Sequence, residues 1–324
     1  MPIYQTIPHM SGGMPPAILG GYQGKSYFVM PYDGADGNTG KSPNSAKETL
    51  FGTYGGHGAA TADRNDIVYL VSQSNTAANT TDYLSTTGTW SKDLTHLVGV
   101  CSGSRLSHRA RVAWISTATS ASDIPLVTWS ADGCYCSNVQ FFSGIGDANL
   151  SFDVLVSGSR NRFHNVHFAG IGHTTNDATG AYSLSVTGSE NYFEGCVIGL
   201  DTIVRAGANN ELVISGEKNH FKDCIFLTYS VTAGRCTVSS TATNYWNLFE
   251  NCQFINWTPN VETGQTNVFD MPAAASAGKV YLHGCAAFGG GAAGIGSAWA
   301  DTDTNIFVSM PIPNTAGGKA LAAT

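Results

Sequence analysis

The sequence has few charged residues. Lys, Arg, Asp and Glu together make up 12% of its 324 residues, and the formal net charge is −7 at pH 7. A weakly acidic chain lacks the positive field with which proteins attract nucleic acid or anionic lipid. We therefore expect neither nucleic acid nor a membrane among its partners. A composition this poor in charge and rich in Gly is more typical of extracellular and virion β-structures than of cytosolic enzymes.

Long apolar runs are also missing. No run reaches the roughly 18 residues that a bilayer-spanning helix needs. The first 21 residues contain neither a basic n-region nor an apolar h-region, so they do not resemble a signal peptide. A β-rich protein without an export signal can leave a cell inside a virion that is released by lysis. The expected location is therefore a virion assembled in the host cytoplasm.

The middle of the chain repeats one motif four times between residues 155 and 254. The copies read L-V-S-G-S-R-N-R-F-H-N-V-H-F, S-V-T-G-S-E-N-Y-F-E-G-C-V-I, V-I-S-G-E-K-N-H-F-K-D-C-I-F and, for the last part, N-L-F-E-N-C-Q-F. The asparagines of successive copies are 30, 28 and 28 residues apart. A fixed period of this length predicts stacked supersecondary units.

Apolar and polar residues alternate within each copy, which predicts strands and bends. Asparagine tolerates the left-handed backbone of a sharp bend, and its amide can bond to the backbone. We expect three ladders of equivalent residues, with the aromatic rings and thiols inside. The members are Asn161, Asn191, Asn219 and Asn247; Phe163, Phe193, Phe221 and Phe249; and Cys196, Cys224 and Cys252, with Val166 at the same position in the first copy.

The pattern N-x-F-x-[NGD]-C-x-[FI] resembles the coils of right-handed parallel β-helices of the pectin-lyase-like superfamily, over about residues 25–288. The resemblance implies an all-β solenoid of seven or eight coils of about 28 residues. The expected organisation is an extended arm (1–24), a cap or entry segment (25–65), the β-helix (66–290) and a C-terminal arm or tail (291–324). This fold carries lyases, hydrolases, tailspikes and inert structural proteins, so it does not fix the function.

The same period extends upstream of the clear repeats. Strands are expected at 66–71, 94–100 and 124–129, and a short capping helix at 45–54. The spacing of five leucines carries this period upstream, at steps of 27, 29, 29 and 29 residues: Leu70, Leu97, Leu126, Leu155 and Leu184. The first 24 residues contain four prolines and are read either as a disordered terminus or as an arm that docks on a neighbouring subunit.

The eight cysteines are expected to be buried thiols rather than a disulfide framework, since the chain is expected to fold in a reducing cytoplasm. Cys285 is expected at the same repeat position as Cys196, Cys224 and Cys252. Cys134 and Cys136 do not have the spacing of a zinc site. No metal or other cofactor is predicted.

Two motifs in residues 33–43 suggest ligands. Residues 35–42 fit a relaxed P-loop, but Pro43 follows at once and the required strand-and-helix context is missing, so nucleotide binding is rejected. Asp33, Asp36 and Asn38 offer oxygen atoms to calcium, but the loop lacks a closing acidic ligand. The alternative is a turn made of Gly, Asn and Asp.

The one basic cluster contains Arg105, Arg109 and Arg111. It is a candidate contact for an acidic partner surface or a sugar acid. The alternative is a solvated strand edge, where surface charges contribute little.

A polysaccharide hydrolase of this fold needs two carboxylates about 5–10 Å apart. The outward residues that follow each Phe are His164, Glu194, Lys222, Glu250 and His283. Opposite charges alternate in this column, which predicts mutual neutralisation and no catalytic pair. His164 and His167 differ by three positions and are expected on opposite faces. We therefore expect a protein that is not an enzyme.

Three functions remain open. The first is a phage capsid decoration or cement protein, a trimer that contacts the major capsid protein through its arms. The second is a tailspike or fibre module that binds, and in some cases cleaves, a host surface polysaccharide. The third is a secreted polysaccharide lyase, which the lack of a signal peptide disfavours.

Overall fold

The computed structural model describes residues 24–72, 81–83, 87–101, 110–114, 125–144, 146, 152–176, 181–207, 210–231, 237–240, 246–257, 265, 267–271, 278–289 and 306–308. The expected N-terminal arm lies outside the described residues, apart from Gly24. Arg105 and Arg109 also lie outside them.

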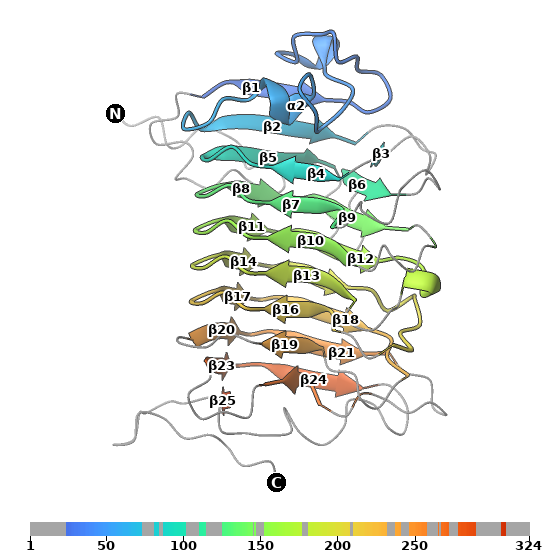
Figure 1. The fold of residues 1–324 in the computed structure, drawn as a ribbon, viewed down its shortest axis with the longest axis vertical. Coiled ribbons are helices and arrows are strands. Elements are labelled where there is room, and N and C mark those ends of the chain that lie inside the picture. The colour runs from blue at the N-terminus through green and yellow to red at the C-terminus, as the bar shows by residue number, and fades with distance from the viewer. Residues whose placement is uncertain are drawn as a thin grey trace.

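The chain winds into a solenoid whose strands form three parallel sheets (Figure 1). Sheet A contains β1 (Ser26–Val29), β2 (Asp66–Val71), β5 (Thr95–Val100), β8 (Tyr135–Ser137), β11 (Arg162–His164), β14 (Tyr192–Glu194), β17 (His220–Lys222), β20 (Trp246–Glu250), β23 (Lys279–His283) and β25 (Ile306–Val308). Sheet B contains β3 (Thr81–Tyr83), β6 (Arg111–Trp114), β9 (Gln140–Ser143), β12 (His167–Ile171), β15 (Val197–Gly199), β18 (Ile225–Thr228), β21 (Gln253–Asn256) and β24 (Ala286–Gly289). Sheet C contains β4 (Gly88–Trp90), β7 (Val127–Trp129), β10 (Phe152–Val156), β13 (Tyr182–Val186), β16 (Leu212–Ile214), β19 (Val238–Ser240) and β22 (Phe269–Asp270).

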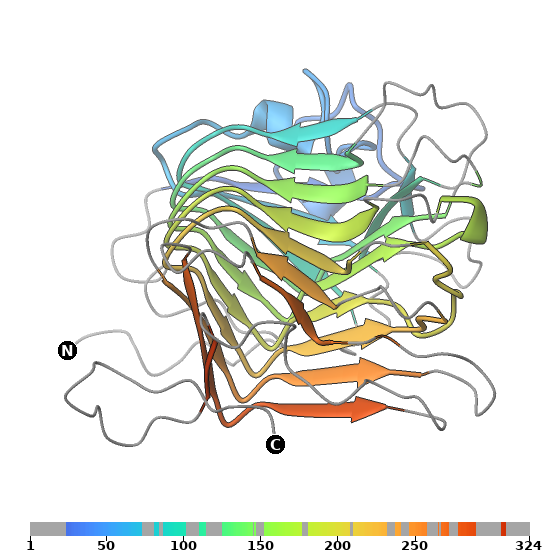
Figure 2. The ribbon, with the colours of Figure 1, turned by 60° about the horizontal axis from the view of Figure 1, so that its bottom comes forward.

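Every coil visits the sheets in the order C, A, B. Within the described residues, each of the seven strands of sheet C is followed by one strand of sheet A and one of sheet B, which gives seven complete coils. The three sheets are the faces of a prism, and equivalent strands lie directly above one another (Figure 2). The right-handed parallel β-helix expected from the repeats is confirmed as the fold of the chain.

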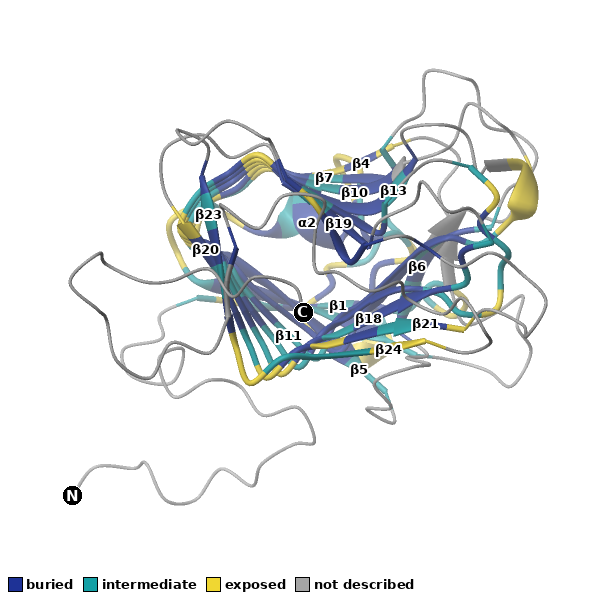
Figure 3. Ribbon diagram, turned by 90° about the horizontal axis from the view of Figure 1, so that it is seen from below, coloured by how far each residue is buried: buried dark blue, intermediate teal, exposed yellow. Residues whose placement is uncertain are grey.

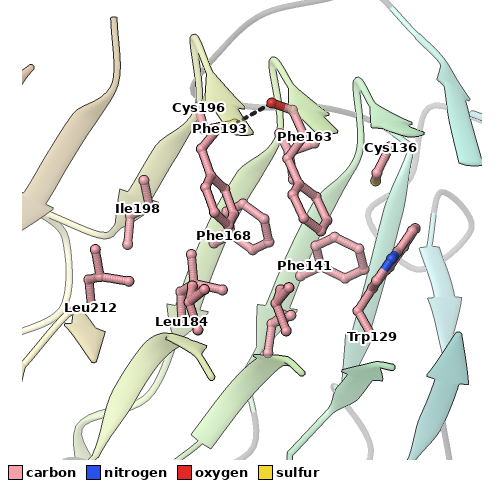
Figure 4. Packing of buried hydrophobic residues seen from close by; sticks show 14 of the residues in the cluster. Trp129, Cys136, Phe141, Phe163, Phe168, Leu184, Phe193, Cys196, Ile198 and Leu212 are labelled. Carbon is pink, nitrogen blue, oxygen red and sulfur yellow. Dashed lines mark hydrogen bonds between the residues drawn. The ribbon is translucent and has the colours of Figure 1, made fainter. Parts of the chain in front are cut away.

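Stacked aromatic rings fill the inside of sheet A. The ring centroids of Phe163 and Phe193 are 4.9 Å apart, and those of Phe193 and Phe221 are 4.6 Å apart. Phe249 continues the stack. At its N-terminal end Trp129 of sheet C meets Phe163 edge to face, and Trp90 stacks on Trp129. Figure 4 shows Phe163 and Phe193 lying parallel above Phe168 of sheet B. Because every ring is fully buried by its neighbours, each coil depends on the next for its core.

The bends are built differently from the sequence-based expectation. The ladder asparagines are not the left-handed residues. The residues that precede the first three of them are, with φ values of 58°, 60° and 57° at Arg160, Glu190 and Lys218. A second left-handed residue separates sheets A and B in six successive coils, at Asn138, Asn165, Gly195, Asp223, Asn251 and Gly284. Seen along the coil axis, buried strands enclose the core and exposed residues gather at the bends (Figure 3). The recurrence of asparagine at this position is therefore explained by the hydrogen bonds of its side chain and not by a left-handed backbone.

The evenly spaced leucines indicate the period of the coils, but they do not form one column. Leu155 pairs with Ser185, whereas Leu184 pairs with Val154 and Leu212. Leu70 and Leu97 belong to sheet A, while Leu155 and Leu184 belong to sheet C. The regular steps between leucines arise because all the coils have similar lengths, so one spacing fits several positions in the repeat.

The segment before β2 closes the N-terminal end of the solenoid. The helix expected at 45–54 is wrong: a 3-10 turn, η1, spans Pro43–Ser45, and the four-residue helix α2 spans Gly56–Ala59. Leu50 is fully buried in the main core. A Cβ added at Gly56 would lie 2.3 Å from Val29 Cγ2, so the helix can approach the first coil only through this glycine. No helix in the described part of the chain, including η3 (Thr174–Asn176), is long and apolar enough to cross a membrane.

The C-terminal region adds one strand to its own chain. β25 pairs with β23 at the end of sheet A. Residues 306–308 therefore continue the solenoid of their own chain. The other residues of the expected C-terminal arm lie outside the described ranges.

Candidate functional site

The four ladder asparagines form one continuous hydrogen-bond chain inside the bend between sheets C and A. The backbone N–H of Asn161 donates to Asn191 Oδ1 at 2.9 Å, and that of Asn191 donates to Asn219 Oδ1 at 2.9 Å. Asn219 donates in the same way to Asn247 at 3.0 Å. Each side-chain nitrogen donates to a carbonyl in the neighbouring coil, such as that of Gly158 for Asn191. All four residues are almost completely buried, which assigns them a structural role.

The cysteine column lies next to the aromatic stack. The thiol of Cys196 donates to the carbonyl of Phe163 at 3.4 Å (Figure 4), and Cys224 and Cys252 repeat the contact one and two coils further on. Burial raises the pKa values of the Cys224 and Cys252 thiols. The seven described cysteines are free thiols. Most of them fill space in the core as small apolar groups, and burial also raises the pKa values of Cys134 and Cys136. At the end of the column, a hydrogen bond with Cys252 lowers the pKa of the half-buried Cys285.

The outer face of sheet A carries the charged column. The register places His164, Glu194, Lys222, Glu250 and His283 side by side on consecutive strands. Glu194 Oε2 is 2.5 Å from Arg162 Nη2 and 3.3 Å from His164 Nδ1. Glu250 is 3.1 Å from His220 Nε2 and 3.6 Å from Lys222 Nζ.

Both glutamates of this column are held by cations on neighbouring strands. Partial burial acts to raise the pKa of Glu194, and the hydrogen bond and charge of Arg162 outweigh it and lower this pKa. Glu250 in turn raises the pKa of Lys222. A glycoside hydrolase needs one carboxyl group whose pKa is raised so that it can act as an acid. Glu194, whose pKa is lowered, is not such a group.

A second group of ionisable residues, which the sequence analysis missed, lies where the chain passes from sheet B to sheet C. We call Asp153, Ser183, Arg205 and Glu211 the polar seam. Arg205 Nε is 3.5 Å from Glu211 Oε1, and Arg205 Nη2 donates to the carbonyl of Ile171 at 2.6 Å. Ser183 Oγ donates to Glu211 Oε2 at 2.5 Å. All four side chains are fully buried.

Backbone geometry keeps the polar seam tightly packed. Gly170 has φ +69°, and its N–H donates to Asp153 Oδ2 at 3.0 Å. A Cβ at Gly170 would lie 2.0 Å from Ser183 Oγ, and one at Gly199 would lie 2.8 Å from the carboxylate of Glu211. Any residue other than glycine would therefore push the seam apart.

Burial raises the pKa of Asp153 well above its usual range, although the N–H of Gly170 and the charge of Arg205 act against it. A protonated acid beside a paired carboxylate and an arginine is a combination also found in active sites. The polar seam, however, is closed to solvent in this structure. Its geometry fits a buried network that joins coils, because Asp153, Ser183 and Glu211 come from three consecutive strands of sheet C or the residues beside them.

The remaining predicted candidates have structural partners. Arg111 is partly buried in β6, and its guanidinium lies 5.6 Å from the ring centroid of Phe142. Asp36 accepts hydrogen bonds from the N–H groups of Glu48 and Thr49, and from the hydroxyl of Thr49. These hydrogen bonds fix Asp36 in a turn, as the alternative to a calcium site predicts. Within the described residues, no group of three or more His, Cys, Asp or Glu side chains could hold a metal ion.

His164 and His167 face different surroundings. His164 is partly exposed beside Glu194. His167 is buried, and its ring nitrogens lie 2.8 Å from Gln140 Nε2 and 3.2 Å from the carbonyl oxygen of Gly199. A bend separates the two histidines, so they belong to sheets A and B and do not alternate along one strand.

Exposed aromatic side chains lie at the C-terminal end of sheet B. Phe288 in β24 is 50% exposed, and Ile255 lies beside it in the register. Trp257, which directly follows β21, is 55% exposed. Sequence analysis assigned no role to these residues, because isolated apolar residues in a repeat look the same whether they face inward or outward.

No protein-family model and no curated protein matches the chain. Similar solved structures include a pectin methylesterase variant in complex with a hexasaccharide, with 11% identity, 91% of this chain and 92% of that chain covered, and a TM-score of 0.46. Pectin methylesterase PemA from Erwinia chrysanthemi has 12% identity, coverage of 90% and 83%, and a TM-score of 0.45. A protein of Geobacillus virus E2, ORF18, has 11% identity, coverage of 77% and 56%, and a TM-score of 0.37. At these identities and TM-scores the similarity carries no argument about activity.

Proposed function

We propose that this chain is a non-catalytic structural protein of a phage virion that decorates the head and cements its capsid subunits. The observation that carries the proposal is the charged column of sheet A. Glu194 and Glu250, its two carboxylates, are each paired with cations on neighbouring strands. A face built this way supports a rigid scaffold better than it supports acid–base chemistry.

The proposed partners are the major capsid protein and further copies of this chain, most simply in a trimer. Residues 1–24 contain no Asp, Glu, Lys or Arg. Such a segment can add backbone hydrogen bonds to the edge of a neighbour's sheet. Several copies on one symmetric oligomer multiply weak contacts through their effective concentration. The solenoid provides the stiff body between these contacts.

The test is to separate purified virions into DNA-filled heads and detached tails and to count copies of the chain by mass spectrometry. Many copies per head are the expected result. In a second step, protein lacking residues 1–24 is mixed with undecorated capsids, and its binding should be lost while its circular dichroism stays unchanged. Absence from heads, or full capsid occupancy by the truncated protein, contradicts the proposal.

A second candidate is a tailspike or fibre module that binds a host surface polysaccharide. The exposed Trp257 and Phe288 favour it, because aromatic faces pack well on sugar rings. The same fractionation separates the two functions, since this one places a few copies with the tails. Cleavage of the glycan would require a site other than the charged column of sheet A.

A further inference from the structure

The cysteine column ends in a pair of neighbouring thiols at the last complete coil. Four cysteines occupy the bend between sheets A and B in successive coils: Cys196, Cys224, Cys252 and Cys285. The pairing of β20 with β23 and that of β21 with β24 have the same register, so Cys252 and Cys285 are direct neighbours on adjacent coils. The N–H of Ala286 donates to the carbonyl of Cys252 at 3.0 Å, which holds this register at the cysteines themselves.

The two thiols contact each other inside this bend. Cys285 Sγ leans toward the preceding coil, where it lies 3.3 Å from the carbonyl oxygen of Phe249. Cys252 Sγ lies at the same distance from the carbonyl oxygen of Phe221, one coil earlier. A hydrogen bond between the two cysteine side chains lowers the pKa of Cys285, whereas burial raises the pKa of Cys252. Cys285 is therefore the better nucleophile of the pair, because the thiolate is the reactive form of cysteine.

Accessibility distinguishes Cys285 from the rest of the column. Cys196, Cys224 and Cys252 are completely buried, whereas Cys285 is partly exposed. It directly precedes β24, which is the last strand of sheet B in the described part of the chain and lies at the C-terminal end of the solenoid (Figure 1). A reagent in solution can therefore reach the column at Cys285, and a second thiol lies directly behind it.

We propose that Cys252 and Cys285 are a redox-reactive pair, which a small-molecule disulfide converts to a disulfide bond within the chain. In the first step, the Cys285 thiolate attacks the small disulfide, and one small thiolate leaves. In the second step, the proton of Cys252 passes to solvent, and its sulfur attacks Cys285 Sγ and expels the other small thiolate. The two protein thiols thereby lose two electrons and two protons, and the small disulfide gains them as two thiols.

The spacing of the two residues suits this bond. Adjacent strands are about 4.8 Å apart, and a disulfide accepts Cα atoms that are about 4.4–6.8 Å apart. The two Cβ atoms have to approach to about 3.8 Å, which is about 1 Å closer than the strand spacing. Among the described residues, β24 has a neighbouring strand on one side only, so Cys285 can move toward Cys252. Cys224 and Cys252 lie between coils on both sides, so the same approach between them would strain two coils.

The bond would join the last described strand of sheet B to the coil before it. In a reducing compartment the two thiols stay separate, and in an oxidising medium the bond forms. An end strand opens more readily than the middle of a solenoid, because it packs against one neighbour instead of two. The pair therefore makes the stability of this end depend on the redox state of its surroundings.

Oxidation of the native, isolated protein tests the pair. The full chain is incubated with glutathione disulfide, its remaining thiols are alkylated, and its peptides are mapped by mass spectrometry over time. The expected product is a crosslinked peptide pair that contains Cys252 and Cys285, preceded by a mixed disulfide at Cys285. In Cys252→Ser the reaction should stop at the mixed disulfide. In Cys101→Ser, which removes another partly exposed thiol, the crosslink should form as in the wild type. A wild type without this crosslink, or with Cys285 joined to a different cysteine, would overturn the inference.

Hydrogen exchange measures the effect of the bond on the end of the solenoid. Amides of residues 279–289 should exchange several-fold more slowly in the oxidised wild type than in the reduced protein, and dithiothreitol should reverse the difference. In Cys285→Ser the oxidant should leave the exchange of these residues unchanged. Equal exchange in the oxidised and reduced wild type would overturn the stabilising role of the bond. The result does not depend on the virion function, because both experiments use the isolated protein.

Discussion

At the residue scale, two buried histidines are held neutral by backbone amides. His96 Nδ1 accepts the N–H of Tyr135 at 3.1 Å, and His57 Nε2 accepts the N–H of Ser91 at 3.2 Å. Burial lowers the pKa of His96 to about 4, although the charge of Asp66 opposes the shift. Burial and the charge of Lys92 lower the pKa of His57 to about 4. A nitrogen that accepts a hydrogen bond in a buried site cannot take up a proton without breaking that bond.

These shifts predict a loss of stability in mild acid. Because the folded pKa of His96 lies below its unfolded value of 6.5, the stabilisation is complete above pH 6.5 and is lost as the pH falls toward 4. Each histidine contributes a slope of about 1.4 kcal/mol per pH unit in this window, or about 3 kcal/mol in total. Urea unfolding of the wild type and of His96→Asn, at intervals from pH 4 to 8, measures the difference. Asn can place an amide oxygen near the position of Nδ1 and does not titrate.

The comparison contains its own control. Carboxylates and other histidines that titrate in the same window affect both proteins, so only the difference between the two curves reports on His96. The gap between wild type and variant should narrow or reverse as the pH falls. Parallel curves from pH 7 to 4 would contradict the pKa assignment.

The sequence predicted equivalent residues correctly where every coil requires the same side-chain chemistry at one position. Asn161 and its equivalents must satisfy the same buried N–H and carbonyl groups in every coil, so they recur at one position. The sequence did not predict positions that several residue types can occupy. The left-handed position before the ladder is taken by Arg160, Glu190 or Lys218, and no single residue type marks it. The evenly spaced leucines indicated the period but not the sheet to which each belongs, because apolar spacing does not distinguish one sheet from another.

At the scale of the element, the polar seam joins strands of sheet C to the segment that contains Arg205. The guanidinium reaches from that segment to the carboxylate of Glu211 and the carbonyl of Ile171. The backbone of Arg205 bonds in addition to Tyr229 and Val231 of the next coil. The residue therefore connects three coils, and its charge is balanced inside the protein and not by water.

Removal of one partner of this buried pair should be costly. In Arg205→Met, Glu211 keeps its charge without its cation, and the expected loss is about 3–5 kcal/mol in the free energy of unfolding. The double variant Arg205→Met/Glu211→Gln should regain most of this loss, because it buries no unpaired charge. Urea unfolding at pH 7 measures all four proteins of the cycle.

The matched control is Arg160→Met, which removes an exposed arginine from its pair with Glu190. Its unfolding midpoint should remain that of the wild type. A loss in Arg205→Met that the second substitution fails to reduce would show that the arginine acts through packing alone.

The polar seam could have been found in the sequence only with the correct register. Asp153, Ser183 and Glu211 lie two positions before residues that pair across sheet C, namely Leu155, Ser185 and Val213. The repeat alignment began at Leu155 and therefore stopped just short of them. Arg205 lies between strands, outside any repeat, so no periodicity predicts its contact with Glu211.

At the scale of the whole molecule, a solenoid is vulnerable at its ends, where an open coil exposes core residues and unpaired strand edges. The segment from 43 to 59 closes the N-terminal end, with Leu50 in the core and the ring of His57 4.6 Å from Trp90. Lys92, in the first complete coil, connects this cap to the solenoid through hydrogen bonds. Its Nζ donates to the carbonyls of His57, Gly58 and Ala60 at 2.8, 2.7 and 2.6 Å.

The cap should therefore open before the coils do when Lys92 loses its charge. Lys92→Met keeps the aliphatic stem and removes the three hydrogen bonds. A hydrogen bond to a charged group contributes about 1.5–3 kcal/mol to stability, and the contributions of three bonds made by one group do not add fully. Hydrogen exchange followed by mass spectrometry should show faster exchange in residues 45–60, with exchange in 184–250 unchanged. Lys222→Met, on the outer face of sheet A, serves as the control and should leave exchange in the cap as it is. Equal acceleration in every coil would mean that cap and solenoid open as one unit, because the aromatic contacts that run from Trp90 to Phe249 couple them too strongly for the cap to separate.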